Sequence, residues 1–446
     1  RAAAFRTGFA PSAVDTHTYI SADDVLRQSN TPEGFPTVWT VTENGGVTSI
    51  AGDYAMDPTI VTGSETALTN ALKALPSISI VTAVSNLFDA SYGIYVHAQE
   101  SGDAWERPTS VEWIDTDNDS KFQIDCGLRI QGSYFRQFVV GSKKKSFSLR
   151  FRSEYGEGRL NEDLFGGSAA QSFNDVVLRA GACDAWDMWI ANEKVQYIVD
   201  EFVRRSHVAM GGISPHGRFV NLYLNGLYWG LYNMVEKISG EYAAAYCGGR
   251  DDTWDVFAQD SINWGSTAPV VLEGDAVAWN VLLGMLNTTT VNNAIYQQIQ
   301  GKNPDGTRNL SYPVYLDMEN YIDYILVEYW AANGDWPHNN WRAFRDRNDS
   351  ISTGFKFSVW DAEFGIGLYN DVSDVSMMDS TAGVAWLHAK LLTNPEYKLR
   401  FADRAQKFLF NGGALTATQS VPRYSELASE VEPAIVAESA RWGDQD

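Results

Sequence analysis

Residues 333–367 read NGDWPHNNWRAFRDRNDSISTGFKFSVWDAEFGIG. Asp335 is followed five positions later by the amide Asn340, and twenty-one positions after that comes a second aspartate, Asp361. Between Asn340 and Asp361, residues 341–347 and 355–360 alternate like β-strands and are separated by turn residues, which predicts a hairpin. A hairpin here would bring Asn340 and Asp361 back beside each other.

The preceding residues suit this layout. Residues 321–330 predict a mostly apolar helix that delivers Asp335 to a loop opened by Asn333-Gly334. An aspartate, an amide at +5 and a second aspartate before an apolar-Gly turn is the arrangement of a protein-kinase catalytic loop and metal-binding turn. One carboxylate there receives the proton of an attacking hydroxyl, while the other oxygens bind Mg²⁺ on the nucleotide phosphates. Each residue alone reads as a turn cap or strand end, but the three in order favour catalysis.

The composition describes an acidic globular protein. With 446 residues the chain is long enough for two or three domains, and 44% of its residues are hydrophobic. The chain has 34 Lys+Arg against 56 Asp+Glu, a net charge of −22, which argues against a nucleic-acid binder or an anionic-membrane binder. No run of about eighteen apolar residues is present, so we expect no membrane span.

The cysteines and the first residues indicate how the chain is cross-linked and whether it is part of a longer polypeptide. Cys126, Cys183 and Cys247 lack metal-ligand spacing and allow at most one disulfide. The first residues do not begin with Met and lack a secretory pattern, so we expect a piece of a longer, multidomain polypeptide.

The order of patterns predicts an α+β fold. Strand-like runs lie at 78–82, 93–97, 110–114, 122–130, 145–151 and 175–179. They are followed by an amphipathic helix at 188–209 and by a hairpin around Asn225-Gly226, and after about residue 270 the pattern is mainly helical. We expect a two-lobed, kinase-like enzyme, with a leader at 1–74, a sheet-rich N-lobe at 75–250 and a mainly helical C-lobe at 251–446.

Several motifs in order resemble the CotH kinase family, named for a spore-coat protein. Residues 128–136, LRIQGSYFR, followed by KKSFSLRF at 144–151, are similar to its arginine- and glycine-bearing strand and turn and its Lys-Lys-Ser strand. LNGLYWGLY at 224–232 with Glu236 is similar to its LNGxYxGxY…E hairpin. Asp335, Asn340 and the WDAE of 360–363 complete the set, so the resemblance runs from about residue 76 to about 410.

The resemblance implies an atypical, extracellular-type kinase. Such an enzyme uses ATP and a divalent metal, Mg²⁺ or else Mn²⁺ or Ca²⁺, to phosphorylate Ser or Thr on surface or secreted proteins. It implies an extracellular or bacterial cell-surface location. By position, Asp335 is the catalytic base, Asp361 the principal metal ligand and Asn340 the second ligand, and Lys145 or Lys144 contacts phosphate.

Departures from the family pattern are informative. Glu363 stands where the family commonly has Asp, and we expect its longer arm to reach a metal ion less rigidly. Gln131 replaces the usual residue before Gly132. Residues 199–200 are Val-Asp where many members show Arg-Asn, which leaves the helix–lysine ion pair open between Glu193, Asp200 and Glu201.

The remaining candidates for nucleotide contacts each have a second interpretation. Arg129 and Arg136 either bind phosphate oxygens or pair with some of the excess acids. Glu236 either contacts nucleotide or metal, or pairs with Lys237 or an arginine. Strand alternation places Lys145 on the apolar face of its strand.

Three functions remain open. The first is the metal-dependent kinase. The second is a catalytically inactive structural or adhesion module, motivated by the Glu363 and Val199 departures. The third is a glycosidase that uses Asp335 with Asp361 or Glu363 and needs neither a lysine nor a metal.

Overall fold

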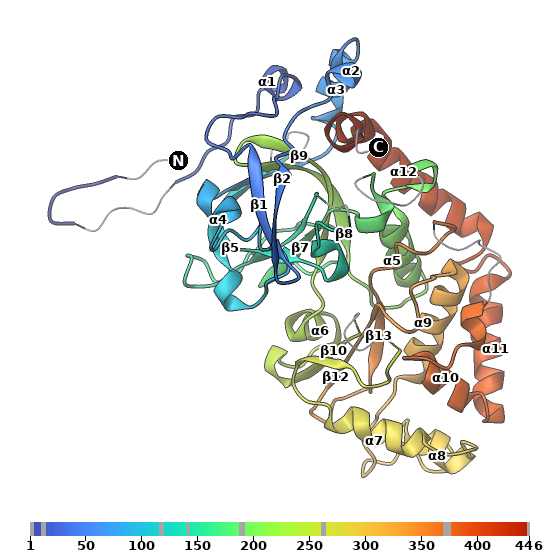
Figure 1. The fold of residues 1–446 in the computed structure, drawn as a ribbon. Coiled ribbons are helices and arrows are strands. Elements are labelled where there is room, and N and C mark those ends of the chain that lie inside the picture. The colour runs from blue at the N-terminus through green and yellow to red at the C-terminus, as the bar shows by residue number, and fades with distance from the viewer. Residues whose placement is uncertain are drawn as a thin grey trace.

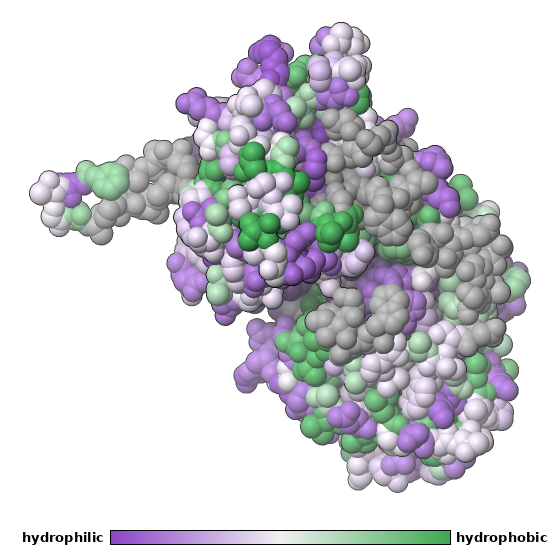
Figure 2. Space-filling view, viewed as in Figure 1, coloured by the Kyte–Doolittle hydropathy of each residue, from purple (hydrophilic) through white to green (hydrophobic). Residues whose placement is uncertain are grey.

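The structure is a computed structural model that describes residues 4–9, 15–115, 120–140, 143–186, 192–259, 265–368 and 376–443. It is an α+β protein, as expected: one group of strands closes into a barrel and a smaller sheet lies among helices. Figure 1 shows the barrel above and the smaller sheet below, and Figure 2 shows that the outline narrows between these two bodies.

The barrel has seven strands in the order β3-β4-β5-β6-β7-β9-β8. All neighbours are antiparallel except β3 and β8, whose parallel pairing closes the barrel. The strands are β3 (Ser77–Val81), β4 (Arg107–Asp115), β5 (Ser120–Gln131), β6 (Ser146–Arg150), β7 (Asp175–Arg179), β8 (Gly217–Leu224) and β9 (Leu227–Glu236). Closure removes the free sheet edges that otherwise invite pairing with other chains.

Five of the six strands predicted between residues 78 and 179 and the predicted hairpin are confirmed, although their closure into a barrel was not predicted. In the β8–β9 hairpin, Asn225 and Gly226 have φ of 50° and 85°, the positive values that a two-residue hairpin turn requires. The strand predicted at 93–97 is wrong. Its backbone forms buried turns, with Gly93 N–H donating to Asp89 O at 2.8 Å and His97 N–H to Gly93 O at 3.1 Å. The consecutive residues Ile94, Tyr95 and Val96 are all buried. Their apolar side chains therefore reflect burial of the whole turn and do not indicate a strand.

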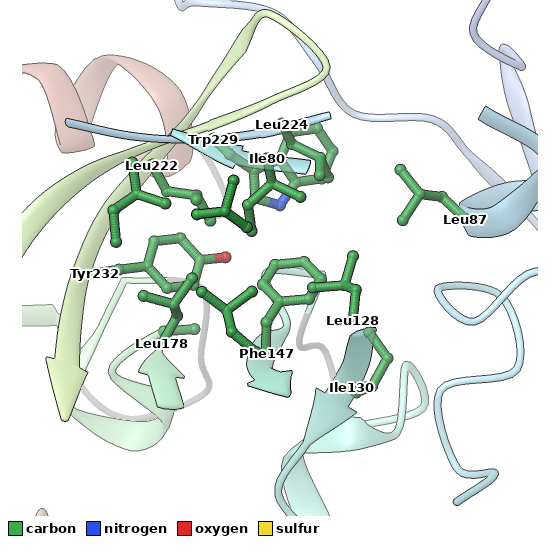
Figure 3. Close-up of a cluster of buried hydrophobic side chains, with 14 of the residues drawn as sticks. Ile80, Leu87, Leu128, Ile130, Phe147, Leu178, Leu222, Leu224, Trp229 and Tyr232 are labelled. Atoms are coloured by element: carbon green, nitrogen blue, oxygen red, sulfur yellow. The ribbon is translucent and has the colours of Figure 1, made fainter. Parts of the chain in front are cut away.

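The barrel interior is filled by apolar side chains that point toward one another from several strands, among them Leu128, Phe147, Leu178 and Trp229 (Figure 3). Residues before the barrel join this core. Trp39, on the hairpin of β1 (Val38–Glu43) and β2 (Gly46–Ala51), stacks on Phe88 at 5.6 Å between ring centroids. Its indole N–H donates to the Tyr54 hydroxyl at 2.6 Å. Part of the segment expected to be a leader therefore packs into the core cluster of the barrel.

Four short helices accompany this half of the chain: α1 (Ala22–Leu26), α2 (Pro58–Val61), α3 (Glu65–Ala71) and α4 (Val84–Phe88).

The second body is built on a four-stranded sheet of order β11-β10-β12-β13. Its strands are β10 (Trp254–Ala258), β11 (Val270–Glu273), β12 (Trp341–Asp346) and β13 (Lys356–Val359). The predicted hairpin around Asn340 and Asp361 is confirmed, because β12 and β13 pair antiparallel from Trp341↔Val359 to Phe344↔Lys356.

Helices complete the second body: α6 (Gly240–Cys247), α7 (Val277–Leu286), α8 (Asn293–Gln298), α9 (Met318–Ala331), α10 (Ala385–Leu391) and α11 (Pro395–Leu409). The predicted helix at 321–330 lies within α9. Aromatic residues such as Trp279, Trp341 and Phe357 form the core between sheet and helices.

Two further helices connect the bodies. α5 (Val199–Ala209) packs on α9, and α12 (Ala417–Trp442) packs across β9, α3 and α5. The helix predicted at 188–209 is confirmed from Val199 onward, and its continuity before that is wrong, because 192–194 form a 3-10 turn and Tyr197 has a φ of 65°. Residues 188–191 lie outside the described ranges. Asp184 accepts from the N–H groups of Gln196 (2.7 Å) and Val199 (3.0 Å), so its carboxylate fixes the turn that precedes α5.

No helix among the described residues is both long and apolar enough to cross a membrane. The three cysteines are free thiols.

Candidate functional site

A cavity of about 300 Å³ lies between the barrel and the second sheet. The barrel contributes the turn after β5 and the ends of β6 and β7, and the second body contributes the residues on either side of the β12–β13 hairpin. Residues with polar or charged side chains in its lining are Gln131, Ser133, Lys144, Ser146, Arg179, Lys237, Asp335, Asn339, Asn340, Arg342, Asp361 and Glu363. The structure thus brings together Asp335, Asn340, Asp361, Glu363 and Lys144, five of the residues singled out from sequence.

Asp335 lies in the loop after α9, and two side-chain amides hold its carboxylate. Its Oδ2 accepts from Asn339 Nδ2 at 3.0 Å and from Asn340 Nδ2 at 2.8 Å. Its Oδ1 lies 3.4 Å from His338 Nε2. Asn340 has a φ of 54°, a left-handed conformation that asparagine tolerates better than most residues. The loop therefore presents one oriented carboxylate at the cavity wall.

Asp361 and Glu363 follow β13, and both contact the same barrel residue. The guanidinium of Arg179, the last residue of β7, binds the carboxylates of Asp361 and Glu363 and lies 3.4 Å from Asp200 Oδ2. Asp200, on α5, also accepts from the Ala362 N–H at 3.0 Å and from Arg204 Nε at 3.0 Å. Three carboxylates, two from the segment after β13 and one from α5, therefore converge on Arg179.

Burial and mutual repulsion set the protonation of this cluster. Burial raises the pKa of Glu363 well above its ordinary value, and Asp361 and Asp200 raise it further against the opposing charge of Arg179. Burial alone would also raise the pKa of Asp200, but Arg204 and Arg179 outweigh it, so that pKa is lowered. Burial disfavours the charged form of Arg179, but the three carboxylates raise its pKa well above the usual value.

The oxygen-rich donor set of Asp361, Asn340 and Glu363 suits a hard divalent cation in chemical type. Its geometry is that of an ion pair with Arg179, and within the described ranges no group of three His, Cys, Asp or Glu is arranged to hold a metal ion. Asn340 Nδ2 also lies 3.3 Å from the backbone oxygen of Asp361, which keeps the amide beside that residue. A cation bound by both carboxylates would take the place of the Arg179 guanidinium.

The two lysines expected near phosphate lie differently. Lys144 lines the cavity, and its ammonium donates to Glu438 Oε1 and to Leu231 O, each at 2.6 Å. Lys145 is buried, with its ammonium 3.9 Å from the Phe138 ring centroid and 3.4 Å from Phe135 O. Of the two, Lys144 is at the cavity.

Arg129, Arg136 and Glu236 are not brought into the cavity. Arg129 binds the carboxylates of Asp103 and Glu106, and Arg136 donates to the carbonyls of Ile130 (2.6 Å) and Glu100 (3.0 Å). Glu236 accepts from the backbone N–H of His216 at 2.8 Å and from the Tyr246 hydroxyl at 2.7 Å, and it lies 2.9 Å from His216 Nδ1. Each of these side chains ties neighbouring segments together.

Sequence reasoning missed Arg179, Lys237 and Arg342. All three line the cavity, where with Lys144 they set four cationic side chains against the three carboxylates of Asp335, Asp361 and Glu363. Arg179 and Lys144 are each also paired with a buried acid behind the lining, Asp200 and Glu438 respectively. The available signal was slight: in the strand DVVLR, Arg179 follows three apolar residues and is buried with them, where a charged residue is unusual unless it is paired.

Comparison with known proteins gives one family. The sequence profile described as CotH kinase protein matches residues 128–446, a range that contains every residue lining the cavity. A search of the curated proteins found no match.

Proposed function

Because the chain belongs to the CotH kinase protein family, we propose that it transfers the γ-phosphate of ATP to serine or threonine side chains of surface or secreted proteins, with the help of a divalent metal ion. The observation that supports this most is the placement of Asp335, Asn340 and Asp361 around one cavity, opposite Arg179 and Lys144. In this proposal, the barrel and the second body act as the two lobes of an atypical kinase.

Asp335 is the proposed catalytic base, which accepts the proton of the acceptor hydroxyl as phosphate is transferred. The amides of Asn339 and Asn340 donate to one oxygen of its carboxylate, so they restrict the rotation that would otherwise turn the base away from the hydroxyl. Asp361, Asn340 and Glu363 would hold the metal ion, which supplies positive charge to the phosphate oxygens.

Arg179 is the proposed phosphate contact on the barrel wall, in place of the expected Lys145. Its planar guanidinium offers paired N–H donors that match phosphate oxygens. Asp200 on α5 lies 3.4 Å from Arg179 Nε and supplies the acidic partner that the helix was expected to provide. When a cation neutralises Asp361 and Glu363, this partner keeps Arg179 near the phosphate site.

The cationic lining favours a phosphorylated ligand over a neutral sugar. A carboxylate-pair glycosidase needs two acids and a water, with no requirement for positive charge. Four cationic residues line the same space, and their charge would attract an anion such as a triphosphate, although Arg179 and Lys144 already have carboxylate partners.

An inactive scaffold is the second candidate, and the engagement of both Asp361 and Glu363 by Arg179 favours it. In a scaffold this ion-pair cluster would be a permanent structural tie. ATP with Mg²⁺ distinguishes the two candidates in a thermal-shift assay, because a ligand present at 100 times its Kd stabilises the folded protein by about 2.7 kcal/mol. A scaffold would show no shift.

Replacing Asp335 tests the proposed chemistry directly. We expect Asp335→Asn to lower the rate of phosphate transfer from labelled ATP to a Ser-rich protein by about 10²-fold or more, the usual contribution of a general base. Asp403→Asn, which neutralises an exposed acid on α11, should leave the rate unchanged. Equal rates in wild type and Asp335→Asn would contradict the assignment, and no transfer and no ATP binding by wild type would favour the scaffold.

A further inference from the structure

A buried ion pair joins the cavity wall to the C-terminal helix. Lys144 Nζ and Glu438 Oε1 are 2.6 Å apart, and the two side chains are 1% and 0% exposed. Glu438 also accepts from the Leu231 N–H at 2.7 Å and from the Tyr197 hydroxyl at 3.1 Å. The Lys144 ammonium lies 4.7 Å from the Tyr232 ring centroid. The Glu438 carboxylate of α12 thus contacts β9, the turn before α5 and the cavity residue Lys144.

The barrel strand is shaped to admit this helix. Gly230 on β9 has a φ of 119°, and a Cβ at this position would lie 2.6 Å from Glu438 Oε2 and 2.8 Å from Trp442 Nε1. Only glycine accommodates both the backbone conformation and this approach. Trp442 Nε1 then donates to Trp229 O at 2.8 Å.

A second tie connects the next lysine to the same helix. Arg441 Nη1 lies 2.9 Å from Asp53 Oδ1, and Lys143 Nζ lies 3.1 Å from Asp53 Oδ2. Lys143 and Lys144 end the segment that begins with the cavity-lining residues 131–135. Both ends of this segment are therefore fixed, one at the cavity and one on α12.

We infer that Glu438 is a positioning residue that holds Lys144 at the cavity wall, so that nucleotide binding and docking of the last two turns of α12 are coupled. The inference rests on the proposed function, since Lys144 matters to a ligand that is anionic. A buried ammonium without its carboxylate carries a large desolvation penalty and moves toward water or loses its proton. Removal of the Glu438 charge would therefore withdraw the Lys144 charge from the cavity.

Titration of the full chain with a fluorescent ATP analogue and Mg²⁺ tests this. We expect Glu438→Gln to weaken binding by about tenfold or more, as when a charge-assisted hydrogen bond is lost. The matched control is Glu430→Gln on the same helix, whose carboxylate lies 3.4 Å from Arg205 on α5, and its affinity should stay within about twofold of wild type. In wild type, the nucleotide should also slow amide hydrogen exchange in residues 436–442.

A second variant covers the case in which Glu438→Gln does not fold. The double variant Lys144→Met with Glu438→Leu replaces a buried ion pair by apolar groups, a change that often preserves folding. It should melt close to wild type and still bind the analogue about tenfold more weakly. Wild-type affinity in the folded double variant would overturn the inference alone. If wild type itself binds no nucleotide, the proposed function fails, and the inference fails with it.

Discussion

Burial raises the pKa of two acids near the candidate site into the neutral range. Glu328 on α9 is fully buried, and its Oε2 accepts from Asn333 Nδ2, at the start of the Asp335 loop, at 2.9 Å. Burial raises its pKa to about 8, and burial likewise raises the pKa of Asp184 to about 7. Both side chains accept hydrogen bonds from segments that lead to the cavity.

These two acids predict a fall in stability as pH rises from about 4.5 to 8. In that range the folded protein keeps protons that the unfolded chain releases, so a rise in pH favours unfolding, by at most about 1.4 kcal/mol per pH unit for each acid. Glu328→Gln should roughly halve this slope between about pH 5 and 7, where Asp184 still contributes, and remove it between about pH 7 and 8, measured by urea unfolding at pH 5, 6, 7 and 8. Glu162→Gln, at an exposed position, is the control, and an unchanged slope in Glu328→Gln would refute the prediction.

At this scale, local spacing predicted Asp335, Asn340 and Asp361 together because one hairpin joins them. Arg179 and the Lys144–Glu438 pair could not be predicted in the same way. Arg179 meets Asp361 across 182 positions, and Lys144 meets Glu438 across 294. No pattern within a window of the sequence records which distant charge a buried cation will meet.

Among the elements, β9 and α12 approach each other closely at Gly230. Gly230→Ala would force a Cβ toward Glu438 and Trp442 in a backbone conformation that alanine disfavours. Because overpacking and positive φ both act here, we expect a loss of about 2–4 kcal/mol in the free energy of unfolding, measured by urea denaturation.

A glycine with no such neighbours provides the opposite control. Gly284 lies within α7, and a Cβ there meets no atom within 4 Å. Gly284→Ala should therefore stabilise the protein by up to about 1 kcal/mol through helix propensity. If Gly230→Ala were as stable as wild type, the close approach of α12 to β9 would be disproved.

Element prediction succeeded where the turn chemistry is strong. The Asn225-Gly226 hairpin was predicted from its turn, although its strands are largely buried on both faces. Prediction failed at 93–97, because apolar residues buried on all sides of a turn look like a strand, and at the start of α5, because capping by Asp184 comes from a distant turn. β10 and β11 were not predicted. β10 pairs with β11, which is a short strand, and with β12, which lies in a distant part of the chain.

At the scale of the whole molecule, the N-terminal segment and the barrel share one core. Trp39 is fully buried against Tyr54, Phe88 and Tyr95. Trp39→Ala should cost about 3–5 kcal/mol of stability, as for other buried aromatic residues.

Val38→Ala, at a half-exposed position of the same strand, should cost less than about 0.5 kcal/mol. Chemical denaturation of both variants measures the difference. A small effect of Trp39→Ala would mean that the segment before residue 75 is separable from the barrel.

The overall arrangement was predictable only in outline. Motif order indicated a sheet-rich part followed by a mainly helical part, and the α+β class followed from it. Closure of the barrel by β3 with β8, and its cover by Trp39 from one end of the chain and Trp442 from the other, depend on contacts between remote residues. Burial of an aromatic residue can be inferred from sequence, but its partner cannot.

The position of α12 has a consequence for synthesis on the ribosome. The last barrel strand ends at Glu236, while Glu438, which pairs with Lys144, is translated 202 residues later. At about 5–20 residues per second, roughly 10–40 s separate the emergence of the strand from that of its covering helix. During this interval the surface of β9 at Gly230 is exposed to solvent or to chaperones that bind nascent apolar surfaces. α12 covers that surface only after Trp442 has been translated.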